Sequence, residues 1–227
     1  MAIAHVGASF ALYDRLRVGV SMPLQLYAEG SSATVRGVRY EAPRSEQGMG
    51  DVRMAAHVRA VGAYASPFSL AGGVRVWLPT GSQAQYLGDG SVRARPQVLV
   101  AGELGHFAYA AEAGVTFRHR DEPIGRAPLG PELGGTAAVG ATFASRRVFV
   151  GPELYFSTVL EDAFRRTTTP LEGALGAHVL LARTVRMGAA LGAGLTRGQG
   201  TPPFRVVIAL EWLVPSFDAS AAEASEQ

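Results

Sequence analysis

Apolar and polar residues alternate with a period of two along almost the entire chain. In residues 148–160 one face would carry Val148, Val150, Pro152, Leu154 and Phe156, and the other Phe149, Gly151, Glu153, Tyr155 and Ser157. The same alternation recurs in 204–214 and 52–62. Because successive side chains of a β-strand point to opposite faces, this pattern predicts strands and excludes amphipathic helices.

Applied to the whole chain, the alternation predicts eleven long strands. They cover residues 2–12, 16–28, 50–63, 69–79, 91–104, 107–118, 132–144, 147–159, 171–182, 185–197 and 203–214. A tilted strand that crosses a membrane needs ~9–11 residues, whereas strands of ordinary globular sheets average ~5–6. The predicted lengths therefore favour a transmembrane β-barrel.

The connections between these strands alternate between short and long. Short turns are expected at 13–15, 65–67, 105–106, 145–146 and 183–184, and long loops at 29–49, 80–90, 120–131, 161–170 and 198–202. Outer-membrane barrels have short periplasmic turns and longer outer loops. The fold class we predict is all-β, a transmembrane antiparallel up-and-down barrel.

Strand parity predicts about twelve strands, of which eleven are visible. If the turn at Asp14 is periplasmic, Met1 lies on the outer side and the last strand ends in the periplasm. Bacterial barrels have an even number of strands, so the first strand is expected to be missing, together with a signal peptide. We assign 1–215 to the barrel and 216–227 to a disordered tail or the start of a linker.

The polar face of the predicted strands carries charges of both signs, nine arginines against seven acids, which suits a water-filled lumen better than a dry core. Asp51 belongs to this face. The other residues expected to line the lumen are Arg17, Arg53, His57, Arg59, Arg75, Arg93, Arg95, Glu103, Glu112, Arg118, Glu132, Glu153, Glu172, His178, Arg186, Arg205 and Glu211. The small positive excess predicts that an open pore prefers anions.

Aromatic residues near the predicted strand ends are candidates for interfacial girdles. They are Phe10, Tyr27, Tyr64, Phe68, Phe117, Phe143 and Trp212. The alternative is a soluble barrel or sandwich with the apolar faces turned inward, which would bind a lipophilic ligand.

Composition and motifs exclude several function classes. The chain has no Cys and no Lys, which removes thiolate chemistry, Walker A loops and Schiff-base lysines. A net charge of +2 without long basic runs argues against nucleic-acid binding. The five histidines show no metal-ligand spacing, and neither a Ser-His-Asp order nor a Gly-x-Ser-x-Gly elbow is present. We therefore expect no metal, no cofactor and no enzymatic activity.

One carboxylate pair remains as a catalytic candidate. Glu103 and Glu112 flank a short turn and would have to meet across the hairpin to act as acid and base. The alternative is that they pair with Arg93, Arg95 or Arg118.

Several strand phrases together resemble a known family. They are GASFALYDRLRVGVSMPLQLY (7–27), GMGDVRMAAHVRA (48–60), VRVWLPTG (74–81), YLGDGSVRARPQVLV (86–100) and GQGTPPFRVVIALEW (198–212). The chain resembles the N-terminal barrel of large OmpA-family proteins of Gram-negative bacteria. In that family a calcium-binding linker and a peptidoglycan-binding domain follow the barrel, and neither is visible here, so peptidoglycan would be bound only through a domain absent from this chain.

The pattern and the resemblance together predict a protein of the bacterial outer membrane in contact with its lipid. The expected role is structural, within the envelope, or that of a narrow pore. The alternative within the membrane is a diffusion channel for small solutes.

Overall fold

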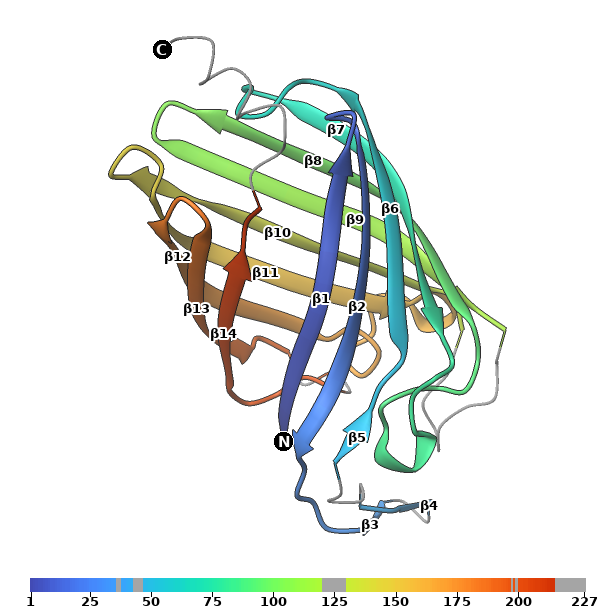
Figure 1. Ribbon diagram of the computed structural model, residues 1–227. Coiled ribbons are helices and arrows are strands. Elements are labelled where there is room, and N and C mark those ends of the chain that lie inside the picture. Colours follow the sequence, from blue (N-terminus) through green and yellow to red (C-terminus); the bar gives the residue numbers. More distant parts are fainter. Residues whose placement is uncertain (36–37, 43–46, 120–129, 197, 199, 215–227) are drawn as a thin grey trace, which may run out of the picture.

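A computed structural model describes residues 1–35, 38–42, 47–119, 130–196, 198 and 200–214. Eleven long antiparallel strands account for most of them (Figure 1). They are β1 (Ala2–Leu12), β2 (Leu16–Tyr27), β6 (Val52–Val61), β7 (Ser69–Leu78), β8 (Arg93–Leu104), β9 (Phe107–Arg118), β10 (Glu132–Phe143), β11 (Val148–Val159), β12 (Leu171–Ala182), β13 (Val185–Gly194) and β14 (Arg205–Trp212). All eleven predicted strands are confirmed, with ends displaced by at most three residues.

The sheet runs in sequence order from β1 to β14, so that each long strand pairs with the next one along the chain. A twelfth, two-residue strand, β5 (Gly48–Met49), pairs with residues 24–25 of β2. Residues 16–21 of β2 pair with β6 along the same edge. The curled sheet is an up-and-down barrel with β1 and β14 at the two ends of the strand order. Because the number of long strands is odd, β1 begins and β14 ends at opposite ends of the barrel (Figure 1).

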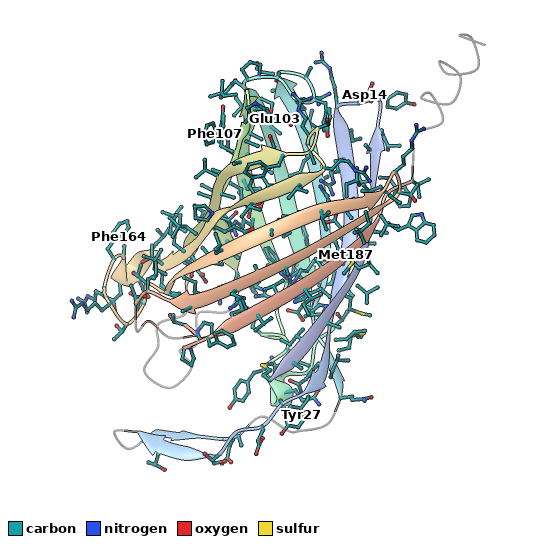
Figure 2. All side chains as sticks on the ribbon, turned by 90° about the vertical axis from the view of Figure 1, so that its left-hand side faces the viewer. Asp14, Tyr27, Glu103, Phe107, Phe164 and Met187 are labelled. Carbon is teal, nitrogen blue, oxygen red and sulfur yellow. The ribbon has the colours of Figure 1, made fainter. Side chains whose placement is uncertain are left out.

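Short turns gather at one end of the barrel and long loops at the other, as the sequence predicts. Asp14 lies at the turn end with Glu103 and Phe107, and Tyr27 lies at the opposite end (Figure 2). Leu12 pairs with Leu16, so the connection has three residues, and Tyr13 and Asp14 both have positive φ, at 51° and 56°, as in a type I′ turn. A tight hairpin of this kind leaves β1 and β2 paired over their full length.

The long loops contain short elements that the alternation did not predict. They are the hairpin of β3 (Ala33–Val35) and β4 (Val38–Tyr40) and the 3-10 turns η1 (Gln83–Gln85) and η2 (Leu160–Asp162). Elements of three residues are too short for a periodic signal. The predicted tail at 216–227 lies outside the described residues.

The distribution of polarity is inverted relative to a soluble domain. Among the described residues the buried hydrophobic core consists of Ala28 alone, whereas the buried polar residues include Gln25, Asp51 and Gln97. Large apolar side chains instead stand exposed along the strands, among them Phe10, Val98, Leu175 and Ile208. The apolar face therefore points outward and the polar face inward.

The described residues include no helix of the length and apolarity that a membrane span requires.

Candidate functional site in the barrel interior

Strand register places every residue expected to line the lumen on the inner face. One row of cross-strand partners follows that face from β2 to β10: Arg17, His57, Gly73, Gln97, Gly114 and Gly134. Tyr155 pairs with Glu172 and Gly192 with Arg205, which extends the same face to β14. Because side chains alternate between faces, the remaining predicted residues follow from these partners.

A chain of five charged groups crosses the inner face near the loop end. Arg93 bonds Asp51 at 2.7 Å and Asp89 at 3.2 Å, and Arg118 lies 3.7 Å from Asp89 and 2.9 Å from Glu132. Because cations and anions alternate, each partly buried charge lies next to a charge of opposite sign. The ion pairs therefore link these side chains to one another along the wall.

Asp51 ties the loop between β7 and β8 to this network. Its carboxylate accepts a hydrogen bond from the Gly81 backbone at 3.0 Å, and its own backbone N–H donates to Leu87 O at 3.2 Å. A Cβ at Gly88 would lie 2.3 Å from the Asp51 carboxylate, so the close approach requires glycine there. The Trp77 ring lies beneath the guanidinium of Arg93, 5.2 Å from its centroid.

A second group of charges lies further from the loops. The Glu112 carboxylate is 3.5 Å from Arg75 and 3.9 Å from Arg95, and Arg95 also donates to Gly134 O at 2.6 Å. The sequence alternative that Glu112 pairs with Arg95 is confirmed, with Arg75 as an additional partner.

The candidate carboxylate pair is not formed. Register sets Glu103 opposite Ala108 and Glu112 opposite Leu99, so the two acids are separated along the hairpin. Glu103 instead lies 2.9 Å from Arg146, in the turn after β10. The acid and base arrangement considered from the sequence is therefore wrong.

Three inner arginines lack a carboxylate within ion-pair distance among the described residues. Arg17 donates to the Ser9 hydroxyl at 3.0 Å, and Arg59 donates to the backbone oxygen of Asp14. Arg53 makes no ion pair with the described acids. All three belong to β2 and β6, which gives this side of the interior uncompensated positive charge.

The inner face of β11 to β14 carries two ion pairs with a cavity between them. Arg205 lies 3.0 Å from Glu172, and Arg186 donates to Glu211 at 2.8 Å. Between these pairs lies a cavity of about 270 Å³. It is lined mainly by small residues of β12 to β14 and by Glu153, Tyr155, Glu172, His178 and Arg205.

Sequence reasoning assigned no role to Asp89, Trp77 or Gln97. Trp77 and Gln97 follow Arg75 and Arg95 by two residues, so the period of two could have placed them on the inner face. Gln97 contacts His57, with 2.7 Å between the Nε2 atoms. Asp89 lies in a loop, where periodicity gives no signal.

No set of three or more His, Asp or Glu side chains within the described ranges is arranged to hold a metal ion.

Comparison with known proteins shows similarity in structure and none in sequence families. No family model matches the chain, and no curated protein matches it. The crystal structure of the COG4313 outer membrane channel from Pseudomonas putida F1 superposes with a TM-score of 0.63, over 92% of this chain and 81% of that one. The two proteins share a fold. At 15% sequence identity the match extends to the barrel architecture and no further.

Proposed function

We propose that the chain forms a β-barrel of a bacterial outer membrane and provides a narrow, charge-lined passage for small hydrophilic solutes. The observation that carries the proposal is the inverted polarity, in which Ala28 is the one buried hydrophobic residue among those described. An antiparallel barrel that is apolar outside and polar inside matches a lipid exterior and an aqueous lumen. The Pseudomonas protein of the same fold is an outer membrane channel.

Exposed aromatic side chains at both ends of the barrel support a lipid surround. Phe10, Tyr64 and Trp212 are 64%, 89% and 77% exposed near the turn end, and Tyr27 and Phe117 are half-exposed near the loop end. Aromatic rings at these two levels fit the interfaces of a bilayer. A soluble barrel that binds a lipophilic ligand would need an apolar interior, so this alternative lacks support.

The geometry of the ion pairs favours a passage over a sealed plug. The interior pairs found among the described residues join groups on the same or nearby strands: Arg118 with Glu132 on β9 and β10, or Arg205 with Glu172 on β14 and β12. None of them joins opposite sides of the barrel. A passage requires interior side chains that lie along the wall, and these pairs meet that requirement. A purely structural envelope role, which the sequence also predicts, would not require this arrangement.

The uncompensated arginines suggest which ions pass more easily. Arg17, Arg53 and Arg59 project positive charge into the interior from one side, so we expect a modest preference for anions. The resemblance to OmpA-family barrels remains a prediction.

Conductance in planar bilayers tests the passage. The chain, refolded in detergent, is added to a bilayer in a KCl gradient, after heat-modifiable gel migration has shown that it is folded. Discrete conductance steps with an anion-selective reversal potential are expected. A folded, inserted protein without conductance would reject the passage and favour the structural envelope role. A monodisperse protein that folds without detergent would overturn the membrane assignment.

A further inference from the structure

The cavity on the inner face of β11 to β14 contains an unusual carboxylate. The other described acids of the inner face each lie within ion-pair distance of an arginine, as Glu112 does with Arg75 and Glu172 with Arg205. Glu153 is the exception, because its partners are the Tyr155 hydroxyl and the His178 imidazole, the latter at 4.0 Å. Its side chain is only 16% exposed.

Glycines on the neighbouring strands provide the space in which these groups lie flat on the sheet. A Cβ at Gly176 would be 2.6 Å from a carboxylate oxygen of Glu153, and a Cβ at Gly188 would be 2.6 Å from Nδ1 of His178. Any larger residue at these two positions would displace the polar groups. The arrangement of carboxylate, phenol and imidazole therefore depends on the small residues around it.

The rest of the cavity is small and apolar. Ala174, Ala190, Val207 and Ala209 contribute to its lining, and Arg205, the one arginine among the described lining residues, is neutralised by Glu172. Its volume of about 270 Å³ is slightly below the ~300–1,000 Å³ typical of pockets for drug-sized ligands. It suits a molecule with a compact apolar body.

We propose that this cavity is a binding site for small organic cations, specifically primary amines with an apolar body. The ammonium group would donate to the Glu153 carboxylate, and the body would lie over the alanines and glycines of β12 to β14. A partly buried carboxylate without a permanent cation lacks the partner that such groups usually have, and an ammonium ion provides it. The site lies in the proposed passage, so this inference deepens the proposed function and rests on it.

Three probes of the same shape and different charge test the proposal. Benzylammonium, benzyl alcohol and benzoate are titrated into the full chain, folded in detergent micelles, and binding is measured by calorimetry. We expect benzylammonium to bind about tenfold or more tightly than benzyl alcohol, as a charge-assisted hydrogen bond implies, and benzoate to bind most weakly. Equal affinities for the amine and the alcohol would overturn the proposal.

Two variants and one matched control locate the effect. Glu153→Gln should remove the difference between amine and alcohol, and Ala190→Leu should weaken both by filling the cavity. Glu211→Gln removes an interior carboxylate from the Arg186 pair outside the cavity and should leave the difference unchanged. A preference for the amine that survives in Glu153→Gln would also contradict the assignment.

Bilayer currents separate this inference from the proposed function. If the protein conducts and millimolar benzylammonium reduces its current more than benzyl alcohol does, both stand. Conductance without any preference for the amine would reject the site and keep the passage. Binding of benzylammonium in micelles by a protein that does not conduct would reject the passage and keep the site.

Discussion

Two regions of the barrel interior differ in how their side chains fill space. The crowded wall, the inner face of β6 to β9, carries Arg53, Arg75, Trp77, Arg93 and Arg95 and is cross-linked by ion pairs. The open wall, the inner face of β12 to β14, carries Gly or Ala at about half of its positions and contains the cavity. Strand pairing is antiparallel and in sequence order on both sides, so we attribute the cavity to the small side chains of the open wall.

The comparison implies a division of roles. Large cross-linked residues on the crowded wall fix the loop between β7 and β8 through Asp51 and would set the charge that ions meet in the proposed passage. Small residues on the open wall leave room for a solute next to Glu153. The same fold therefore carries a network of ion pairs on one side and a cavity on the other.

The largest expected effect is on the stability of the crowded wall. Asp51→Asn removes a carboxylate that is 2% exposed and bonded to Arg93. Loss of one partner from a buried ion pair costs about 3–5 kcal/mol, and we expect the lower end because Asp89 still contacts Arg93. Urea unfolding of the refolded barrel in liposomes, followed by tryptophan fluorescence, measures the change.

The control for this variant lies on the open wall. Glu211→Gln breaks the pair with Arg186, whose side chains are 45% and 46% exposed. Exposed pairs contribute about 0–1 kcal/mol. Equal losses of unfolding free energy in the two variants would show that the ion pairs of the two walls contribute equally to stability.

Much of this architecture was predictable because it depends on a local rule. The period of two located the eleven strands and placed Arg75 and Glu112 on the same face. What it could not supply were contacts that depend on loops and on strand register. Asp89 reaches Arg93 and Arg118 from a loop, and Arg146 reaches Glu103 from the turn after β10.

The cavity on the open wall is a second feature that the sequence alone did not predict. Alternation identified Glu153, Glu172 and His178 as inward residues, but a cavity arises from what is missing next to them. Only the register shows that Gly176 and Gly188 lie beside Glu153 and His178. Small residues in an alternating strand pattern do not by themselves predict a cavity, so the structure was needed to locate this one.

The next effect concerns glycines at the boundary between the two walls. Gly140 and Gly151 face each other across β10 and β11, and a Cβ at Gly151 would lie 2.1 Å from Val139 O. Gly151→Ala should lower the free energy of unfolding by about 1–3 kcal/mol, as overpacking does. Urea unfolding in liposomes is again the measurement.

A glycine on the outer face provides the matched control. A Cβ at Gly72 of β7 would have no atom within 4 Å. Gly72→Ala should leave stability unchanged or raise it by about 0.4–1 kcal/mol, because alanine reduces the entropy of the unfolded chain. If Gly151→Ala were as well tolerated as Gly72→Ala, the close contact of β10 and β11 would be disproved.

The smallest expected effect is on ion selectivity and depends on the uncompensated charge next to the crowded wall. Arg53 of β6 has no carboxylate within ion-pair distance among the described residues, so in the proposed passage its charge would act on passing ions. Arg53→Gln should lower the anion-to-cation permeability ratio by up to about twofold, equivalent to ~0.4 kcal/mol.

Arg165→Gln changes charge by the same amount in a loop, where the side chain is 71% exposed and solvent screens it, and should have no effect. Reversal potentials in a KCl gradient compare the two variants. A larger shift for Arg165→Gln would mean that the loops, and not the interior wall, set the selectivity.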